Sequence, residues 1–268
     1  MSDVSGGSAM AFARWVRRFA RRTVPAKALH AYRMVRHIHL APFERELAIL
    51  PRLVAKTDVA FDVGANVGLY SAVLSRCSRR VVAIEPNPGC AAYLRRLKLP
   101  RVDVVEAAAA ETAGRATLVV PDIHHGLGKL ATAPRAFEPG APEMRYSVAT
   151  ISLDAVCAVR LACNERVGFI KIDVEGFELD VLRGAAVLLA NHRPNLMVET
   201  EFRHGADVRA VFALLAGSGY AGFVLGKDGE LEPIDADRLA SLQAAACGAP
   251  ARRPVNNVIF LPKAEHSA

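Results

Sequence analysis

The feature that most constrains the fold of this chain is an alternation of short apolar stretches with amphipathic ones. The strand-like stretches are VAFDV (59–63), VVAIE (81–85), VDVVEA (102–107), GFIKIDV (168–174) and NLMVETE (195–201). The helix-like stretches lie near 43–55 and at 67–76, 87–97, 177–190 and 206–216. Strands that are apolar on both faces and alternate with helices are typical of a parallel sheet covered on both sides. We therefore predict a doubly wound, mostly parallel α/β fold.

Two further strand patterns close the chain, AGFVL (221–225) and NVIFLP (257–262). A polar segment joins them and shows no clear crossover helix, so we expect the last strand to run antiparallel. The chain has 268 residues and is 52% hydrophobic, which is enough for one large α/β domain with a substantial core.

The first 42 residues form a basic arm. Part of the net charge of +7 is gathered there, in Arg14, Arg17, Arg18, Arg21, Arg22, Lys27, Arg33 and Arg36. Because Trp15 and Phe19 are interleaved with these charges at helical spacing, residues 10–22 are typical of an amphipathic helix. Such a helix could contact an anionic membrane surface, or it could pack its aromatic stripe on the folded domain and leave its arginines in water. Both interpretations remain open.

Location and partners are constrained by what the sequence lacks. No apolar run approaches the roughly 20 residues that cross a bilayer, and the start lacks the order of a secretory signal. The five cysteines are scattered and odd in number, which argues against a disulfide framework and a zinc ribbon. We expect a cytoplasmic protein, with the arm as a candidate for membrane association. We expect no nucleic-acid partner, because no RNA-binding module or platform of stacking aromatics is present.

The segment 122–150 interrupts the alternation of strands and helices. It follows a strand-like ATLVVP (116–121), contains HHGLG, and shows no sustained apolar period. A loop this long in a compact domain is usually functional or disordered. We interpret it as a lid over the acceptor substrate, with a disordered insertion as the alternative.

The turn after the first strand, GANVGL (64–69), carries glycines that let backbone N–H groups approach an anion. A G-x-G-x-x-G pattern anchored on Gly64 fails at Asn66 and Leu69. Asp62 would also repel a pyrophosphate by several kcal/mol in a partly dry cleft. The ligand is therefore expected to be cationic at this point, as S-adenosylmethionine is at its sulfonium and amino groups.

The rest of that cofactor site follows from the next strand. Glu85 lies about 20 residues after the turn, where an acidic side chain accepts hydrogen bonds from ribose hydroxyls. Pro86 and Asn87 would then run along the adenine. The predicted cofactor-binding residues are Asp62, Gly64, Asn66, Gly68, Glu85, Pro86, Asn87 and Asp173. The alternatives are a helix-capping or turn aspartate for Asp62 and a solvated strand-end carboxylate for Glu85.

Five stretches together resemble the FkbM family of S-adenosylmethionine-dependent methyltransferases. They are FDVGANVGLYSAVLS, VVAIEPNP, TISLDAV, IKIDVEGFELDVLRGA and LMVETE. The resemblance covers roughly residues 43–262 and implies a methyltransferase domain at 43–265. It also implies the class I methyltransferase fold, a Rossmann-like seven-stranded sheet with an antiparallel last strand. By the same resemblance, the acceptor would be a hydroxyl group of a sugar, glycan or other natural product.

A second group of carboxylates supplies candidate catalytic residues. Asp173 and Glu175 lie at the tip of one strand, and Glu199 at the tip of the next, where ligands bind in this fold class. The resemblance makes Asp173 cofactor-proximal, so Asp173 or Glu175 could remove the acceptor's proton. Glu199 could complete an oxygen-ligand site for Mg²⁺. Lys171 could instead form an ion pair with one of these acids.

Other residues and other functions remain as alternatives. His124, His125 and His204 are further candidates for a general base. Glu178 is better explained as an acid that stabilises a helix N-terminus. The alternatives to an O-methyltransferase are a NAD-dependent oxidoreductase and a non-catalytic module that docks on a membrane or an anionic glycolipid.

Overall fold

The computed structural model describes residues 45–121, 129–130, 143–202, 207–246 and 255–264, together with Ala28. The chain divides into two units at Glu44 and Arg45, and the second unit carries the fold described below. The predicted basic arm, apart from Ala28, lies outside the described residues, as do His124, His125 and His204. None of the helices in the described ranges is both long enough and apolar enough to span a membrane.

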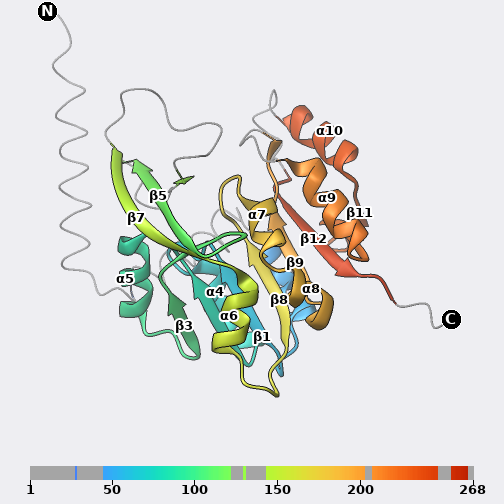
Figure 1. The fold of residues 1–268 in the computed structure, drawn as a ribbon. Coiled ribbons are helices and arrows are strands. Elements are labelled where there is room, and N and C mark those ends of the chain that lie inside the picture. Colours follow the sequence, from blue (N-terminus) through green and yellow to red (C-terminus); the bar gives the residue numbers. More distant parts are fainter. Residues whose placement is uncertain are drawn as a thin grey trace, which may run out of the picture. The chain divides into compact units, whose positions relative to one another are not determined.

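Within these ranges, eight strands form the main sheet (Figure 1). They are β1 (Val59–Val63), β2 (Arg80–Ile84), β3 (Val102–Val105), β8 (Val167–Ile172), β9 (Asn195–Glu199), β10 (Tyr220–Leu225), β11 (Leu231–Pro233) and β12 (Asn257–Pro262). Their order across the sheet is β11-β10-β12-β9-β8-β1-β2-β3.

The direction of the strands confirms the predicted fold class. β1, β2, β3, β8 and β9 pair in parallel. The last strand, β12, runs antiparallel to both of its neighbours, β9 and β10. β11 pairs with β10 at the edge and adds one strand to the predicted seven.

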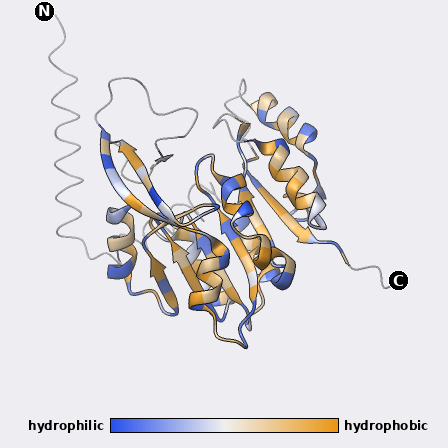
Figure 2. Cartoon of the chain, viewed as in Figure 1, coloured by the Kyte–Doolittle hydropathy of each residue, from blue (hydrophilic) through white to orange (hydrophobic). Residues whose placement is uncertain are grey.

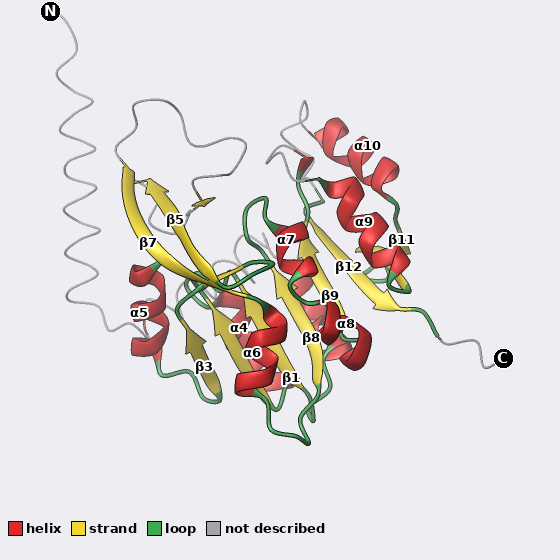
Figure 3. Cartoon of the chain, in the orientation of Figure 1, coloured by secondary structure: helices red, strands yellow, loops and turns green. Residues whose placement is uncertain are grey.

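The helices flank the sheet, as Figure 3 shows. They are η2 (Arg45–Ile49), α3 (Leu50–Leu53), α4 (Leu69–Cys77), α5 (Pro88–Leu97), α6 (Leu153–Arg160), α7 (Glu178–Arg183), α8 (Ala186–His192), α9 (Val208–Gly217) and α10 (Ala236–Ala246). The patterns at 67–76, 87–97 and 206–216 correspond to α4, α5 and α9. The segment before β12, in which no clear helix was expected, contains α10.

One predicted helix, 177–190, is two helices in the structure. The helix is interrupted between α7 and α8 at Gly184, which packs against the backbone of Ala110. A Cβ atom at Gly184 would lie 2.2 Å from the Ala110 carbonyl oxygen, so only glycine fits there. Asp154 then accepts hydrogen bonds from the backbone N–H groups of Val187 and Leu188 and caps α8.

Both faces of the central strands β1 and β8 are buried, and this explains why these strands are mostly apolar (Figure 2). On one face, Val59, Phe61 and Val63 of β1 belong to a core cluster that includes residues of α6, α7, α8 and α9. Successive strand residues point to opposite faces, so Asp62 lies on the other face, toward α4. The strand registers place Lys171 and Glu199 on that same face.

A second, smaller sheet is formed by β4 (Ala108–Ala109), β5 (Gly114–Pro121), β6 (Lys129–Leu130) and β7 (Glu143–Ile151). β5 and β7 make a long antiparallel ribbon. Residues 143–150, which the sequence pattern left inside an irregular segment, thus belong to a strand. Met144, Tyr146 and Val148 of β7 are half-buried or buried and alternate with exposed residues, so the strand has a short apolar alternation that the interpretation of the sequence missed. Residues 122–128 and 131–142 lie outside the described ranges.

Candidate active site

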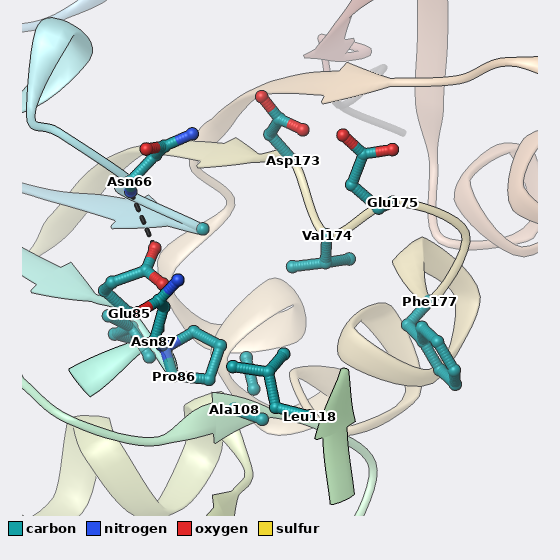
Figure 4. Close-up of a pocket in the computed structure, with 13 residues that line it drawn as sticks. Asn66, Glu85, Pro86, Asn87, Ala108, Leu118, Asp173, Val174, Glu175 and Phe177 are labelled. Atoms are coloured by element: carbon teal, nitrogen blue, oxygen red, sulfur yellow. Dashed lines mark hydrogen bonds between the residues drawn. The ribbon is translucent and has the colours of Figure 1, made fainter. Parts of the chain in front are cut away.

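A pocket lies at the carboxyl ends of β1, β2 and β8, and it holds about 700 Å³ of empty space continuous with solvent. The two sheets both contribute to its walls (Figure 4). The described residues that line it are Gly64, Asn66, Ile84, Glu85, Pro86, Asn87, Ala108, Ala109, Leu118, Asp173, Val174, Glu175 and Phe177. Six of the eight predicted cofactor-binding residues are in this set, and Asp62 and Gly68 are not.

The turn after β1 packs against the end of β8. Gly64 has a φ of +78°, and a Cβ atom there would lie 1.8 Å from the backbone oxygen of Asp173. The Asp173 N–H donates to the Val63 carbonyl at 3.0 Å, and the Gly64 N–H donates to Ile84 at 2.9 Å. The ends of the three strands are therefore held together by backbone contacts that leave no room for a side chain at Gly64.

Glu85 joins the two loops at one end of the pocket. Its carboxylate oxygens accept hydrogen bonds from the backbone N–H groups of Asn66 and Asn87, each at 2.7 Å. Burial raises the pKa of Glu85 to about 7. Each carboxylate oxygen has a second lone pair, so Glu85 can still accept a hydrogen bond from a ligand hydroxyl.

Asp62 is buried on the α4 side of the sheet rather than at the mouth of the pocket. The hydroxyl of Ser71 donates to its Oδ2 at 2.5 Å. Burial raises the pKa of Asp62 to about 6. The pairing of Asp62 with a cationic cofactor group stays a prediction. The same holds for cofactor binding at Gly68, the residue with a φ of +80° that precedes α4.

Of the three predicted catalytic residues, two line the pocket and the third, Glu199, does not. Asp173 and Glu175 line the pocket, and in Figure 4 both carboxylates are at its upper wall. Glu199 is half-buried and is not among the described residues that line the pocket. Burial, and then the nearby Asp173 carboxylate, raise the pKa of Glu199 well above its ordinary value. Lys171 forms the ion pair that was one interpretation of it, with its Nζ 3.7 Å from Asp173 Oδ2.

Metal binding receives no support from this arrangement. In the part of the chain that the structure describes, no three His, Cys, Asp or Glu side chains are grouped in a way that could hold a metal ion. We therefore derive no role for Mg²⁺.

Several residues of the pocket were not expected from the sequence. Ala108 and Ala109 come from β4, Leu118 from β5 and Phe177 from the turn before α7. The run EAAAAE (106–111) gave no sign of a binding role, because small apolar residues are common in cores. Leu118 could not be assigned to the pocket, because the sequence did not predict the second sheet.

Glu178, the first residue of α7, is nearly fully buried. Its Oε1 accepts a hydrogen bond from the Gly176 N–H at 3.0 Å, so it helps to hold the turn that carries Glu175. Burial raises the pKa of Glu178 from its ordinary value of 4.5 to about 7. The folded protein therefore binds this proton more tightly than the unfolded chain does.

Glu178→Gln is expected to reduce the pH dependence of stability. Because the pKa of Glu178 is raised on folding, its ionisation favours the unfolded chain as the pH rises from 4.5 to 7, by about 3 kcal/mol. The Glu178→Gln variant has no carboxyl group at this position to ionise, so it should not lose this stability as the pH rises. Urea denaturation at pH 4.5 and pH 8 measures it, with Asp180→Asn on the exposed side of α7 as the control. An equal pH dependence in wild type and Glu178→Gln would contradict the assignment.

Comparison with known proteins identifies the family. The model of the Methyltransferase FkbM domain matches residues 62–224, which is more than half of the chain. The chain therefore belongs to the FkbM methyltransferase domain family. The matched range contains the turn after β1, Glu85, and the strand ends at Asp173 and Glu199.

Individual relatives are more distant. The hexuronic acid methyltransferase AglP of Haloferax volcanii is 28% identical over 169 residues, which cover 59% of this chain and 62% of that protein. The chain thus spans less than two thirds of that relative's length.

Among solved structures, the methyltransferase FkbM of Methylobacillus flagellatus has a TM-score of 0.47 and 17% identity, over 77% of this chain and 44% of that one. The precorrin-6y C5,15-methyltransferase of Geobacter metallireducens has a TM-score of 0.42 and 16% identity, over 82% and 86%.

Proposed function

We propose that this protein is an S-adenosylmethionine-dependent methyltransferase that methylates a hydroxyl group of a sugar, a glycan or a related natural product. The observation that carries the proposal is the pocket itself. In a chain of the FkbM methyltransferase domain family, one cavity brings together the glycine turn after β1, a carboxylate after β2 that can accept from ribose hydroxyls, and a second carboxylate after β8.

The donor set of the pocket fits the cofactor. Glu85 can accept from the ribose hydroxyls, and the apolar side chains of Ile84, Ala108 and Leu118 suit a flat purine. The acidic end, at Asp173, suits the positive charge of the sulfonium and amino groups. When bound, S-adenosylmethionine would supply an electrophilic methyl group, whose carbon–sulfur bond breaks with its electron pair remaining on sulfur.

The chain's own task at the acceptor is to align a hydroxyl and to receive its proton. Asp173 is the carboxylate in the best position, because it lines the pocket and is about one third exposed. Glu175, beside it on the same wall, could orient the acceptor through a second hydroxyl. A sugar acceptor is supported by the name of the AglP relative, which acts on a hexuronic acid.

Glu85→Gln is expected to weaken the binding of S-adenosylhomocysteine about 100-fold. The amide places an N–H₂ group against one of two backbone donors that the carboxylate now accepts from, and each charge-assisted bond contributes roughly 1.5–3 kcal/mol. Isothermal titration of wild type and variant measures the change. Glu106→Gln is the matched control, since Glu106 is an exposed acid paired with Arg95, and it should bind within about twofold of wild type.

The same titrations distinguish the alternative functions. Binding of NAD in place of S-adenosylhomocysteine would favour an oxidoreductase, and vesicle binding without any nucleoside binding would favour a docking module. With cofactor binding established, the acceptor class is tested with a panel of methyl glycosides and methyl glucuronides. Formation of S-adenosylhomocysteine is the readout.

A further inference from the structure

The turn between β8 and α7 holds Glu175 in a strained backbone conformation. Glu175 has a φ of +55°, and Gly176, which follows it, has a φ of +107°. The left-handed region costs free energy for a residue that has a Cβ atom, so Glu175 stays there only because its surroundings hold it. Residues held in this way cluster in active sites, and Glu175 lines the pocket.

Both ends of this turn are anchored by backbone hydrogen bonds. At the strand end, the Asp173 N–H donates to the Val63 carbonyl of β1 at 3.0 Å. At the helix end, the Phe177 carbonyl accepts from the Val181 N–H of α7 at 3.1 Å. Neither of these hydrogen bonds involves residues 174–176, so a further contact is needed to hold the middle of the turn.

Glu178 supplies that contact. It is the first residue of α7 and is 3% exposed. Its Oε1 accepts a hydrogen bond from the Gly176 N–H at 3.0 Å. This N–H belongs to the planar peptide group that joins Glu175 to Gly176. The hydrogen bond therefore fixes the orientation of that peptide group, and with it the backbone on the far side of the Glu175 Cα atom.

We infer that Glu178 is a positioning residue for the acceptor, because through Gly176 it holds the left-handed turn that sets the Glu175 carboxylate at the pocket. In Figure 4 this carboxylate lies beside that of Asp173, on the same wall. Rotation about the N–Cα bond of Glu175 moves its Cβ atom relative to Asp173, so a relaxed turn would carry the carboxylate away. Glu178 is not among the described residues that line the pocket, so it acts on the acceptor through Glu175.

The inference rests on the proposed function, in which Glu175 binds a second hydroxyl of the acceptor while Asp173 receives the proton. A misplaced Glu175 should weaken acceptor binding more than it slows the reaction of the bound acceptor. The expected signature is a raised KM with a smaller change in kcat. Affinity for S-adenosylhomocysteine should stay within about twofold of wild type, because Glu85 and the apolar residues proposed to hold its nucleoside are outside this turn.

The test is the steady-state kinetics of Glu178→Leu with the methyl glycoside or methyl glucuronide that the wild type methylates. Leucine is of similar size but cannot accept from the Gly176 N–H, and KM should rise about tenfold. Glu178→Gln keeps an oxygen that can accept and should return KM to within about threefold of wild type. An unchanged KM in Glu178→Leu, or an equal rise in both variants, overturns the inference.

Two further variants separate positioning from a purely structural role. If Glu178 acts through Glu175, Glu178→Leu should not raise KM further once Glu175→Gln has removed the acceptor's partner. Effects on KM that multiply in the double variant overturn the inference. Val181→Ala is the control for stability, because Val181 is a fully buried residue of the same helix. It should lower the free energy of unfolding without raising KM, and a rise equal to that in Glu178→Leu would also overturn the inference.

Hydrogen exchange at Gly176 tests the contact without any substrate, and its first step needs no variant that must fold. In wild type with isotope-labelled glycine, the Gly176 amide should exchange at least about tenfold more slowly than an unprotected glycine amide. Glu178→Leu should remove this protection and Glu178→Gln should retain it. Fast exchange in wild type, or equal protection in Glu178→Leu, overturns the inference. A wild type that protects Gly176 but binds no S-adenosylhomocysteine would overturn the proposed function instead.

Discussion

Gly64→Ala is expected to lower the free energy of unfolding by more than about 3 kcal/mol and to abolish binding of S-adenosylhomocysteine. The new Cβ would lie 1.8 Å from the backbone oxygen of Asp173, so the turn after β1 or the end of β8 must move. Neither can move freely, because Asp173 N–H donates to Val63 and Gly64 N–H donates to Ile84. Displacing both strand ends would disrupt the pocket and part of the core.

The control for Gly64→Ala is Gly229→Ala. Gly229 also has a positive φ, +87°, but a Cβ atom there would meet nothing within 4 Å. This variant should lose only the roughly 1–2 kcal/mol that a left-handed backbone costs a non-glycine residue. The free energies of unfolding of both variants, measured by urea denaturation, separate the effect of the close contact from the effect of the left-handed backbone. Equal losses would mean that the close approach to Asp173 is not the cause.

Asp173→Asn is expected to lower turnover by a factor of about 10² to 10⁴ and to leave affinity for S-adenosylhomocysteine within a few-fold of wild type. Loss of a general base costs about this much, and asparagine keeps the size and hydrogen-bonding shape of the side chain. Initial rates with a methyl glycoside acceptor, set beside isothermal titration, separate catalysis from binding.

The comparison for Asp173→Asn is Glu175→Gln. Glu175 lies on the same wall of the pocket and has a φ of +55°. If it only orients the acceptor, the amide variant should raise KM more than it lowers kcat. Full turnover in Asp173→Asn, together with loss of kcat in Glu175→Gln, would mean that Glu175 rather than Asp173 is the general base.

The main sheet and the position of the pocket could be predicted from the sequence for one physical reason. Strands buried on both faces must be apolar along their whole length, and the carboxyl ends of parallel strands meet at one edge. Glu85, Asn66 and Asp173 each directly follow such a strand or lie in its turn, so their place in the pocket followed from their place in the chain. The antiparallel direction of β12 was predicted from the lack of a clear crossover helix before it; the direction is confirmed, but that reason is wrong, because α10 lies there.

The parts that could not be predicted depend on contacts between distant segments. The break between α7 and α8 is caused by Gly184 against Ala110, more than 70 residues away along the chain. The strand β7 does alternate, with Met144, Tyr146 and Val148 facing inward, but this short apolar signal lies in a segment that was interpreted as a loop. Asp62 was expected at the pocket mouth, since the sequence could not show that Ser71 of α4 would cover it.

The second sheet has a small core of its own and also contributes residues to the pocket. Leu118 and Ala108 belong to a small core cluster of the second sheet, separate from the main core, and yet both line the pocket. The proposed purine wall thus rests partly on a core of its own. Substitutions at Leu118 are expected to alter how the pocket holds the nucleoside while leaving the core beneath the main sheet in place.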